Sequence, residues 1–165
     1  MTPGSQPSGG NEEPRYSAHY DEPLSDEPRH RDLLAWWEGK RGERQVPTRS
    51  ELNPAELRAH MGSLELIEVV EGDDYRYRLL GTHITEAYGR DSTGKTVREL
   101  YADDPALLCF LLGMYRTVAS RGVVGRSQGD LGTVGREYRR FDGLLLPLAR
   151  DDGEVGWLLG QLLFE

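Results

Sequence analysis

The chain has 165 residues, which is enough for one domain with a sizeable buried core. It carries 20 Lys and Arg against 28 Asp and Glu, and a net charge of −8 repels phosphate backbones, so no direct nucleic-acid partner is expected. Cys109 is the single cysteine, which excludes an internal disulfide framework and a thiolate metal cluster, and no metal is assigned.

The first 25 residues are rich in Pro, Gly, Ser and acidic residues and contain little to bury. They predict a disordered tail over 1–25, followed by one domain over 26–165. The N-terminus lacks the basic-then-apolar order of a signal peptide, and no apolar run approaches the roughly 20 residues of a spanning helix. We therefore expect a cytoplasmic protein without a membrane partner.

The segment RHRDLLAWWEGKRG repeats apolar residues at helical spacing, and predicts an amphipathic helix that starts near Pro28 and ends at Gly39 or Gly42. Trp36 and Trp37 lie about 100° apart around such a helix, so one small domain seldom buries both. We expect at least one ring to contribute to an exposed apolar patch, the kind of surface that marks interfaces. The alternative is that both rings cover the open face of a sheet.

A short helix is predicted next, because Asn53 can cap it and Gly62 can end it. The hydrophobic period then changes. LELIEVV (64–70) is rich in β-formers, and YRYRLLG (75–81) alternates after an EGDD turn. Together these segments predict a β-hairpin.

Short helical turns broken by glycines follow, and Asp104 and Pro105 then open the longest predicted helix, which Gly122 closes. A glycine-rich strand is predicted over 123–130. Two further strands, REYRRFDGLLLPLA and VGWLLGQLLF, meet at a hairpin turn around Asp152 and Gly153. Strand pairs that flank a helical insert predict an α+β fold, with an antiparallel sheet and helices gathered on one face.

The stretch GRDSTGKT, from Gly89 to Thr96, matches G-x-x-x-x-G-K-S/T, the pattern of a P-loop. A P-loop leaves a buried strand directly and enters a helix, whose first amides bind phosphate. Here the preceding strand ends at Gly81, and barely two helical turns remain before Pro105. We interpret the match as turn chemistry with Lys95 in solvent, and nucleotide binding through Gly89–Thr96 as the minor alternative.

With its neighbours the stretch reads YRYRLLGTHITEAYGRDSTGKT, which resembles a motif of small single-domain PAS proteins of alphaproteobacteria, f-x-Y-R-L-x-G-T-x-I-x-x-x-x-G-R-D-x-T-G-R/K. Lys95 stands where Arg is the commoner letter, and this change creates the apparent P-loop. The tryptophan-bearing helix and the closing LLLPLARDDGEVGWLLG resemble the same family, over about residues 30–163. The resemblance implies a PAS fold: five antiparallel strands, with helices over one face enclosing a small cavity.

The resemblance also implies a sensory or signalling module, not an enzyme, that binds a small apolar or aromatic ligand, a signalling protein partner, or both. The alternative is a degenerate PAS scaffold with a filled core that mediates only protein contacts. The candidate ligand-binding residues, which would equally serve as plain core, are Tyr77, Leu79, Ile84, Tyr88, Leu111, Met114, Tyr115, Leu146 and Trp157. Arg78 and Arg90 are polar candidates, because an arginine can bind a ligand carboxylate bidentately or pair with a nearby acid.

No flavin or haem signature accompanies the resemblance, so the cofactor is unknown. The flavin-binding branch requires an Asn-Cys-Arg motif, whereas Cys109 lies in LLCFLL and is expected to be a buried small apolar residue. The helix 105–121 has no histidine for haem iron, and His83 is expected to be an ordinary histidine. PAS domains often dimerise through the helix before the sheet, so a homodimer with Trp36 or Trp37 at its contact is expected.

Overall fold

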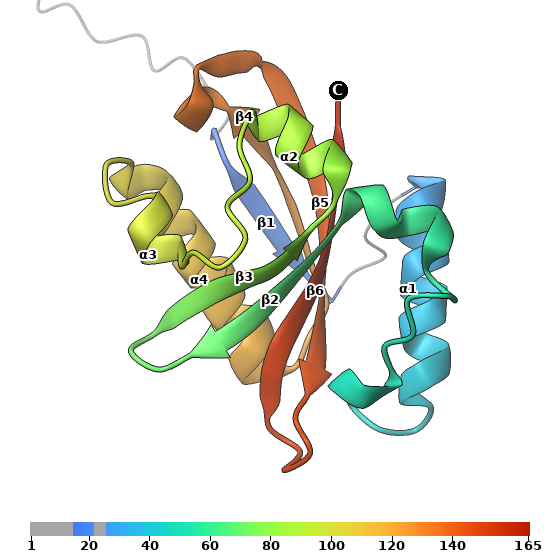
Figure 1. Ribbon diagram of the computed structural model, residues 1–165. Coiled ribbons are helices and arrows are strands. Elements are labelled where there is room, and N and C mark those ends of the chain that lie inside the picture. Colours follow the sequence, from blue (N-terminus) through green and yellow to red (C-terminus); the bar gives the residue numbers. More distant parts are fainter. Residues whose placement is uncertain (1–14, 22–25) are drawn as a thin grey trace, which may run out of the picture.

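The computed structural model describes residues 15–21 and 26–165. Its elements, in chain order, are β1 (Ser17–Tyr20), α1 (Pro28–Arg41), the 3₁₀ helices η1 (Arg49–Glu51) and η2 (Arg58–Ser63), β2 (Leu64–Val70), β3 (Asp74–Leu80), α2 (Thr82–Tyr88), α3 (Val97–Leu100), α4 (Pro105–Arg121), β4 (Gly125–Leu131), the 3₁₀ helix η3 (Gly132–Val134), β5 (Arg136–Ala149) and β6 (Val155–Phe164). Figure 1 shows one central sheet, with α1 on one side and α3 and α4 on the other.

The sheet is antiparallel throughout, in the order β1-β4-β5-β6-β2-β3. The predicted hairpins β2–β3 and β5–β6 are both present, and β6 joins them by pairing with β2. The long β5 and β6 strands therefore form the centre of the sheet. This arrangement confirms the predicted α+β PAS fold, with one strand more than expected.

The extra strand is β1, which lies in the segment that we predicted to be disordered. Ser17–Tyr20 pairs with β4, and the side chains of Ala18 and Tyr20 pack against the core on the α4 side of the sheet. The prediction of disorder is therefore wrong for these four residues, because a short strand with few apolar side chains gains its stability from a distant partner strand. Residues 1–14 and 22–25 of the predicted tail lie outside the described residues.

The two long helices begin and end where their capping residues predict. Helix α1 starts at Pro28, and Gly42 follows its last residue with φ 57°, a conformation that favours glycine. Helix α4 starts at Pro105, where the Asp104 carboxylate accepts a hydrogen bond from the Leu107 amide, and Gly122 ends it. These caps define both helices independently of the core.

The short helix predicted from Asn53 to Gly62 is instead a turn followed by η2. The Asn53 side chain accepts a hydrogen bond from the Ala55 amide at 3.0 Å, two residues ahead. Such a local bond competes with helix formation, so the residue that was expected to cap a helix forms a turn. The helical segment begins only at Arg58 and is a 3₁₀ helix.

The sheet separates two apolar cores. Helices α3 and α4 pack on one face, through side chains that include Val97, Leu111 and Tyr115. Helix α1 packs on the other face through Leu33 and Trp37. Because the central strands are covered on both sides, β5 and β6 carry nearly continuous apolar runs rather than an alternating pattern.

Candidate functional site

A cavity of about 50 Å³ lies between the sheet and the helices α2, α3 and α4. A single water needs about 10–15 Å³ by this measure, so the cavity has room for about three to five non-hydrogen atoms. Most of its lining is apolar, from Leu, Ile, Met and Phe side chains. The residues at its wall that carry polar groups are Glu65, Tyr77, Tyr88, Arg90, Ser92, Tyr101, Tyr115 and Ser127.

Most of the predicted ligand-binding residues lie at this cavity. Tyr77 comes from β3, and Ile84 and Tyr88 come from α2. Helix α4 contributes side chains from one face, because its residues at i, i+3 and i+4 point the same way. The predicted residues that line the cavity are Tyr77, Ile84, Tyr88, Arg90, Leu111, Met114 and Tyr115.

Leu79 and Arg78 do not line the cavity, because the pairing of β3 with β2 shifts at this point. Leu66 pairs with Leu79, but the next residue of β2, Ile67, pairs with Tyr77. Such a bulge reverses the alternation of the strand, so Leu79 packs on the α1 face and Leu80 takes its place at the cavity. Arg78 is exposed, and its Nε donates a hydrogen bond to a Glu68 carboxylate oxygen at 3.0 Å.

Leu146 and Trp157 also lie on the α1 face of the sheet rather than at the cavity. Their neighbours Leu145 and Leu158 belong to the core beneath α4 instead. Both strands are apolar at almost every position, so alternation does not reveal which residues point to which face. The prediction placed these two residues on the wrong face for this reason.

Four tyrosines, Tyr77, Tyr88, Tyr101 and Tyr115, line the cavity. The hydroxyl groups of Tyr77 and Tyr115 are hydrogen-bonded to each other at 2.9 Å. Burial raises the pKa of Tyr77, Tyr88 and Tyr115 well above the ordinary value, and raises the pKa of Tyr101 to about 12. All four hydroxyls therefore stay protonated at physiological pH, and the rings are neutral aromatic surfaces.

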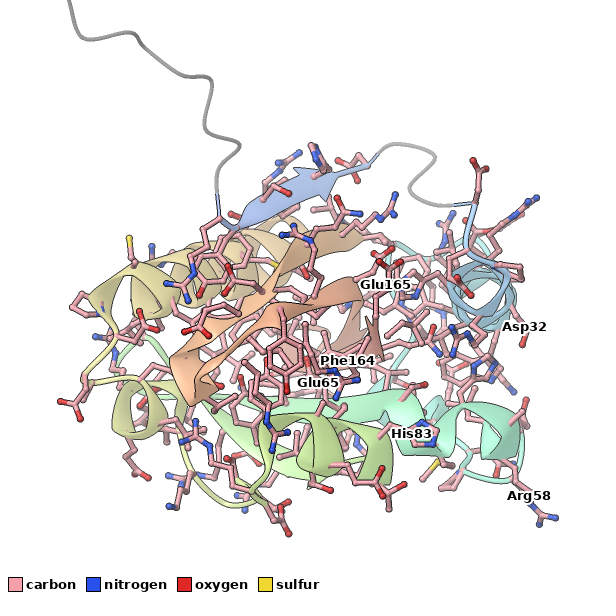
Figure 2. The ribbon with its side chains drawn as sticks, turned by 90° about the horizontal axis from the view of Figure 1, so that it is seen from above. Asp32, Arg58, Glu65, His83, Phe164 and Glu165 are labelled. Carbon is pink, nitrogen blue, oxygen red and sulfur yellow. The ribbon has the colours of Figure 1, made fainter. Side chains whose placement is uncertain are left out.

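Glu65 is the site residue that sequence reasoning does not single out. It belongs to β2, lies in the interior of the molecule in Figure 2, and is only 5% exposed. Burial raises its pKa to about 7. Its pairing partner across the sheet is Gly160, where a Cβ atom would lie 2.6 Å from the Glu65 Cγ, so glycine provides the space that this side chain occupies. Side chains alternate between the two faces of a strand, so Glu65 and Glu68, three positions apart, point to opposite faces. This spacing is the sequence signal that could have predicted an inward-pointing glutamate.

A second polar cluster is buried on the opposite face, beneath α1. The Gln161 amide of β6 contacts two histidines: its Oε1 lies 2.9 Å from His30 Nδ1, and its Nε2 lies 3.0 Å from His60 Nδ1. Ser63 Oγ donates to the His60 carbonyl and accepts from Gln161 Nε2, which fixes the orientation of the amide. His60 Nδ1 is therefore an acceptor, and its Nε2–H donates to Asp32 at 2.6 Å.

The second histidine of this cluster also faces a carboxylate. His30 is 1% exposed, and its Nε2 lies 3.4 Å from an Asp142 oxygen. Burial alone would raise the pKa of Asp142, but the nearby His30 ring and the hydrogen bonds from Arg126 outweigh it and lower that pKa to about 2. A continuous polar chain thus connects α1, η2 and the sheet on the face away from the cavity.

The two tryptophans of α1 both pack on its inner side. Trp37 is 4% exposed, and its Nε1–H donates to the Pro147 carbonyl at 2.9 Å. Trp36 is half-buried against the same core. Trp37 therefore covers the sheet and adds nothing to an exposed patch. Cys109, which we expected to be buried, is exposed instead, because it lies on the outer side of α4.

The stretch Gly89–Thr96 connects α2 to α3 and does not have the strand–loop–helix geometry of a P-loop. It lies beside β3: the Gly94 amide donates to the Tyr77 carbonyl at 2.7 Å, and the Tyr77 amide donates to the Lys95 carbonyl at 3.0 Å. The Asp91 carboxylate accepts from the Thr93 amide and stabilises the turn. These contacts support the interpretation as turn chemistry.

Neither a metal cluster nor a membrane span is found in the described part of the chain. Within residues 15–21 and 26–165, no three His, Cys, Asp or Glu side chains are grouped in a way that could hold a metal ion. No helix of this part is long and apolar enough to cross a membrane.

An antiparallel sheet with helices closing a small cavity over one face defines an α+β domain with an internal pocket. A family model described as a PAS domain matches residues 25–163. The chain therefore belongs to the PAS domain family, whose members are in general sensory and signalling modules rather than catalysts.

Comparison with solved structures finds distant relatives. An RNA-binding Light-Oxygen-Voltage receptor is 18% identical with a TM-score of 0.46, over 72% of this chain and 35% of that chain. An IcIR transcriptional regulator from Alicyclobacillus acidocaldarius is 15% identical with a TM-score of 0.32, over 66% of this chain and 52% of that chain. The chain thus spans about a third and about half of the length of these two proteins. No curated protein is significantly similar to it.

Proposed function

We propose that this protein is a sensory PAS module whose cavity binds a small molecule and whose ligand state is passed to a signalling partner. The observation that carries the proposal is the buried carboxylate of Glu65, which faces a cavity walled mostly by apolar and aromatic side chains. A scaffold with a filled core would gain stability from an apolar side chain at this position. A few polar groups converging in an apolar pocket are typical of ligand sites.

Strand β6 provides a route from the cavity to the opposite face of the sheet. Leu162 lines the cavity, and the preceding residue, Gln161, is hydrogen-bonded to His30 of α1 and to His60 of η2. Neighbouring residues of a strand move together, so a ligand that displaces Leu162 also changes the hydrogen bonds that hold α1. Helix α1 is therefore the element through which occupancy of the cavity reaches a partner in this proposal.

Native mass spectrometry of the purified full-length chain tests the proposal. The expected result is a population with one bound molecule, which a cavity-filling variant, Ser127→Leu, does not retain. Ser127 is 4% exposed and lines the cavity, whereas Ser120 is exposed on α4, so Ser120→Leu is the matched control. Protein that never carries a ligand, whether purified from its own host or mixed with metabolite extracts, would favour the scaffold that mediates only protein contacts.

A further inference from the structure

We propose that the ligand of the cavity is a small organic cation, a methylated ammonium ion of about three to five non-hydrogen atoms, whose charge is balanced by the Glu65 carboxylate. The inference rests on the proposed function, because it assigns a chemical class to the ligand of that same cavity. Glu65 supplies the negative charge, and the surrounding tyrosines supply aromatic faces.

The first argument is that Glu65 has no partner of its own. Within residues 15–21 and 26–165, its carboxylate forms neither a hydrogen bond nor an ion pair, although it is only 5% exposed. A buried carboxylate without a partner is costly, and either a proton or a cation must compensate it. The cavity next to this carboxylate provides the space for such a cation.

The second argument is the aromatic wall. The rings of Tyr77, Tyr88, Tyr101 and Tyr115 line the same cavity, and the negative charge of Glu65 contributes to the raised pKa of each. The phenol groups therefore lie within electrostatic reach of the carboxylate. Clusters of neutral aromatic rings around a carboxylate attract alkylated ammonium ions through cation–π interactions.

The third argument comes from the other charged groups of the wall. The titratable groups that line the cavity are Glu65, the four tyrosines and Arg90. Arg90 is exposed, and its guanidinium lies over the Tyr101 ring, 5.8 Å from the centroid, so one of these rings already binds a cation. An anionic ligand would meet the charge of Glu65, and an apolar ligand would leave a proton as the only compensation of the carboxylate. A monovalent organic cation would balance the charge of the carboxylate and interact with the faces of the aromatic rings.

The size of the cavity further limits which organic cations can be the ligand. At about 50 Å³ it is far below the volumes of roughly 300–1,000 Å³ that hold drug-sized ligands. Dimethylammonium, trimethylammonium and tetramethylammonium match this volume in their number of non-hydrogen atoms. The much larger ring systems of a flavin or a haem do not match it, so these three ions are the appropriate probes.

The test is calorimetric titration of the full chain at pH 8 with trimethylammonium, at matched chloride concentration. Isopropanol is the neutral control, because it has the same number and branching of non-hydrogen atoms, and acetate is the anionic control. Trimethylammonium should bind at least tenfold more tightly than either control. Glu65→Gln should remove this preference, whereas Glu68→Gln, on the same strand but paired with Arg78, should leave it unchanged.

The pH dependence of binding gives a second readout that needs no variant. The affinity for tetramethylammonium, which has a permanent charge, should fall as pH decreases below about 7, because protonation of Glu65 removes its charge. In protein labelled with ¹³C-glutamate, the carboxyl resonance of Glu65 should titrate at lower pH when tetramethylammonium is present. An unchanged midpoint would overturn the inference, even if Glu65→Gln fails to fold.

The outcomes separate this inference from the proposed function. Equal affinity for trimethylammonium and isopropanol, or a neutral or anionic molecule in the native mass spectrum, would overturn the cation class and leave a ligand-binding module. The absence of any bound molecule, together with no response to the three ammonium ions, would overturn both.

Discussion

His30 and His60 contact opposite ends of one buried amide, since the Gln161 oxygen lies 2.9 Å from His30 Nδ1 and the Gln161 nitrogen lies 3.0 Å from His60 Nδ1. The two histidines come from α1 and η2, and the amide comes from the central strand β6. Gln161 is fully buried, so no water replaces these bonds from outside. A single side chain thus fixes two helical segments to the sheet.

Replacement of this amide should destabilise the domain. Gln161→Leu keeps the approximate volume but leaves buried polar atoms of His30, His60 and Ser63 without their partner, and we expect the free energy of unfolding to fall by about 3 kcal/mol. Urea denaturation with an unchanged m-value measures this loss. Gln45→Leu is the control, because Gln45 is exposed, and it should cost less than about 1 kcal/mol. Equal losses in the two variants would contradict the role of the cluster.

The stability of the protein should depend on pH through Glu65. Its pKa is raised from 4.5 to about 7 by burial, so between these values the folded protein holds a proton that the unfolded chain has lost. Stability contributed by this residue therefore falls as pH rises through that window, by up to about 3 kcal/mol, and is constant above it. Glu65→Gln lacks this dependence, so wild type should lose stability relative to the variant between pH 5 and 8. Glu68→Gln controls for the removal of one carboxylate from the same strand.

The hydroxyl pair of Tyr77 and Tyr115 should show energetic coupling. Tyr115→Phe leaves the buried Tyr77 hydroxyl without its partner at 2.9 Å, and should cost about 1–2 kcal/mol. The double variant Tyr77→Phe/Tyr115→Phe should cost less than the sum of the single changes, because two apolar rings need no partner. Urea unfolding of the four proteins measures the cycle. Tyr138→Phe, at a residue that is 80% exposed, should have almost no effect, and additive losses in the cycle would refute the coupling.

Association as a homodimer remains a prediction, and the structure directs its test to Trp36. Trp37 is buried beneath α1, so Trp37→Ala should lower the free energy of unfolding by about 3–5 kcal/mol and says little about association. Trp36 is half-buried, and Trp36→Ala should convert a dimer into a folded monomer. Sedimentation velocity of both proteins at equal concentration, with circular dichroism as the check on folding, decides this. A wild-type monomer at tens of micromolar would rule out the predicted dimer.

The architecture could be predicted largely from local signals. Asp104 and Gly122 mark the ends of α4, and the turn at Gly153 marks the hairpin β5–β6, because capping and turn preferences depend on few neighbouring residues. Strand β1 could not be predicted in this way. Its four residues carry a weak pattern, and their partner β4 lies more than 100 positions later in the chain.

The candidate site was predictable only where side-chain direction follows from the sequence. Tyr77 precedes the bulge and lines the cavity as expected, whereas Leu79 follows the bulge and faces α1. The register shift between the strands depends on their pairing and leaves no mark in either segment. The burial of Glu65 was not predicted, because a polar residue in a strand usually faces solvent. Helices cover both faces of this sheet, and this arrangement is not evident from the strand alone.

The sheet ends in β1 on one side and in β3 on the other, and among the described residues only β3 has a further backbone segment bonded to its outer side. Strand β1 pairs with the outer side of β4, and Gly94, Lys95 and Thr96 bond to the outer side of β3 around Tyr77. A strand with unpaired amides and carbonyls is a template on which another chain can add, so the β3 edge is protected against strand addition, whereas β1 pairs on one side only within the described residues. The stretch that resembles a nucleotide-binding loop thus covers the outer edge of β3. A partner that recognises the domain by strand exchange would have to displace β1, which is held by only four residue pairs.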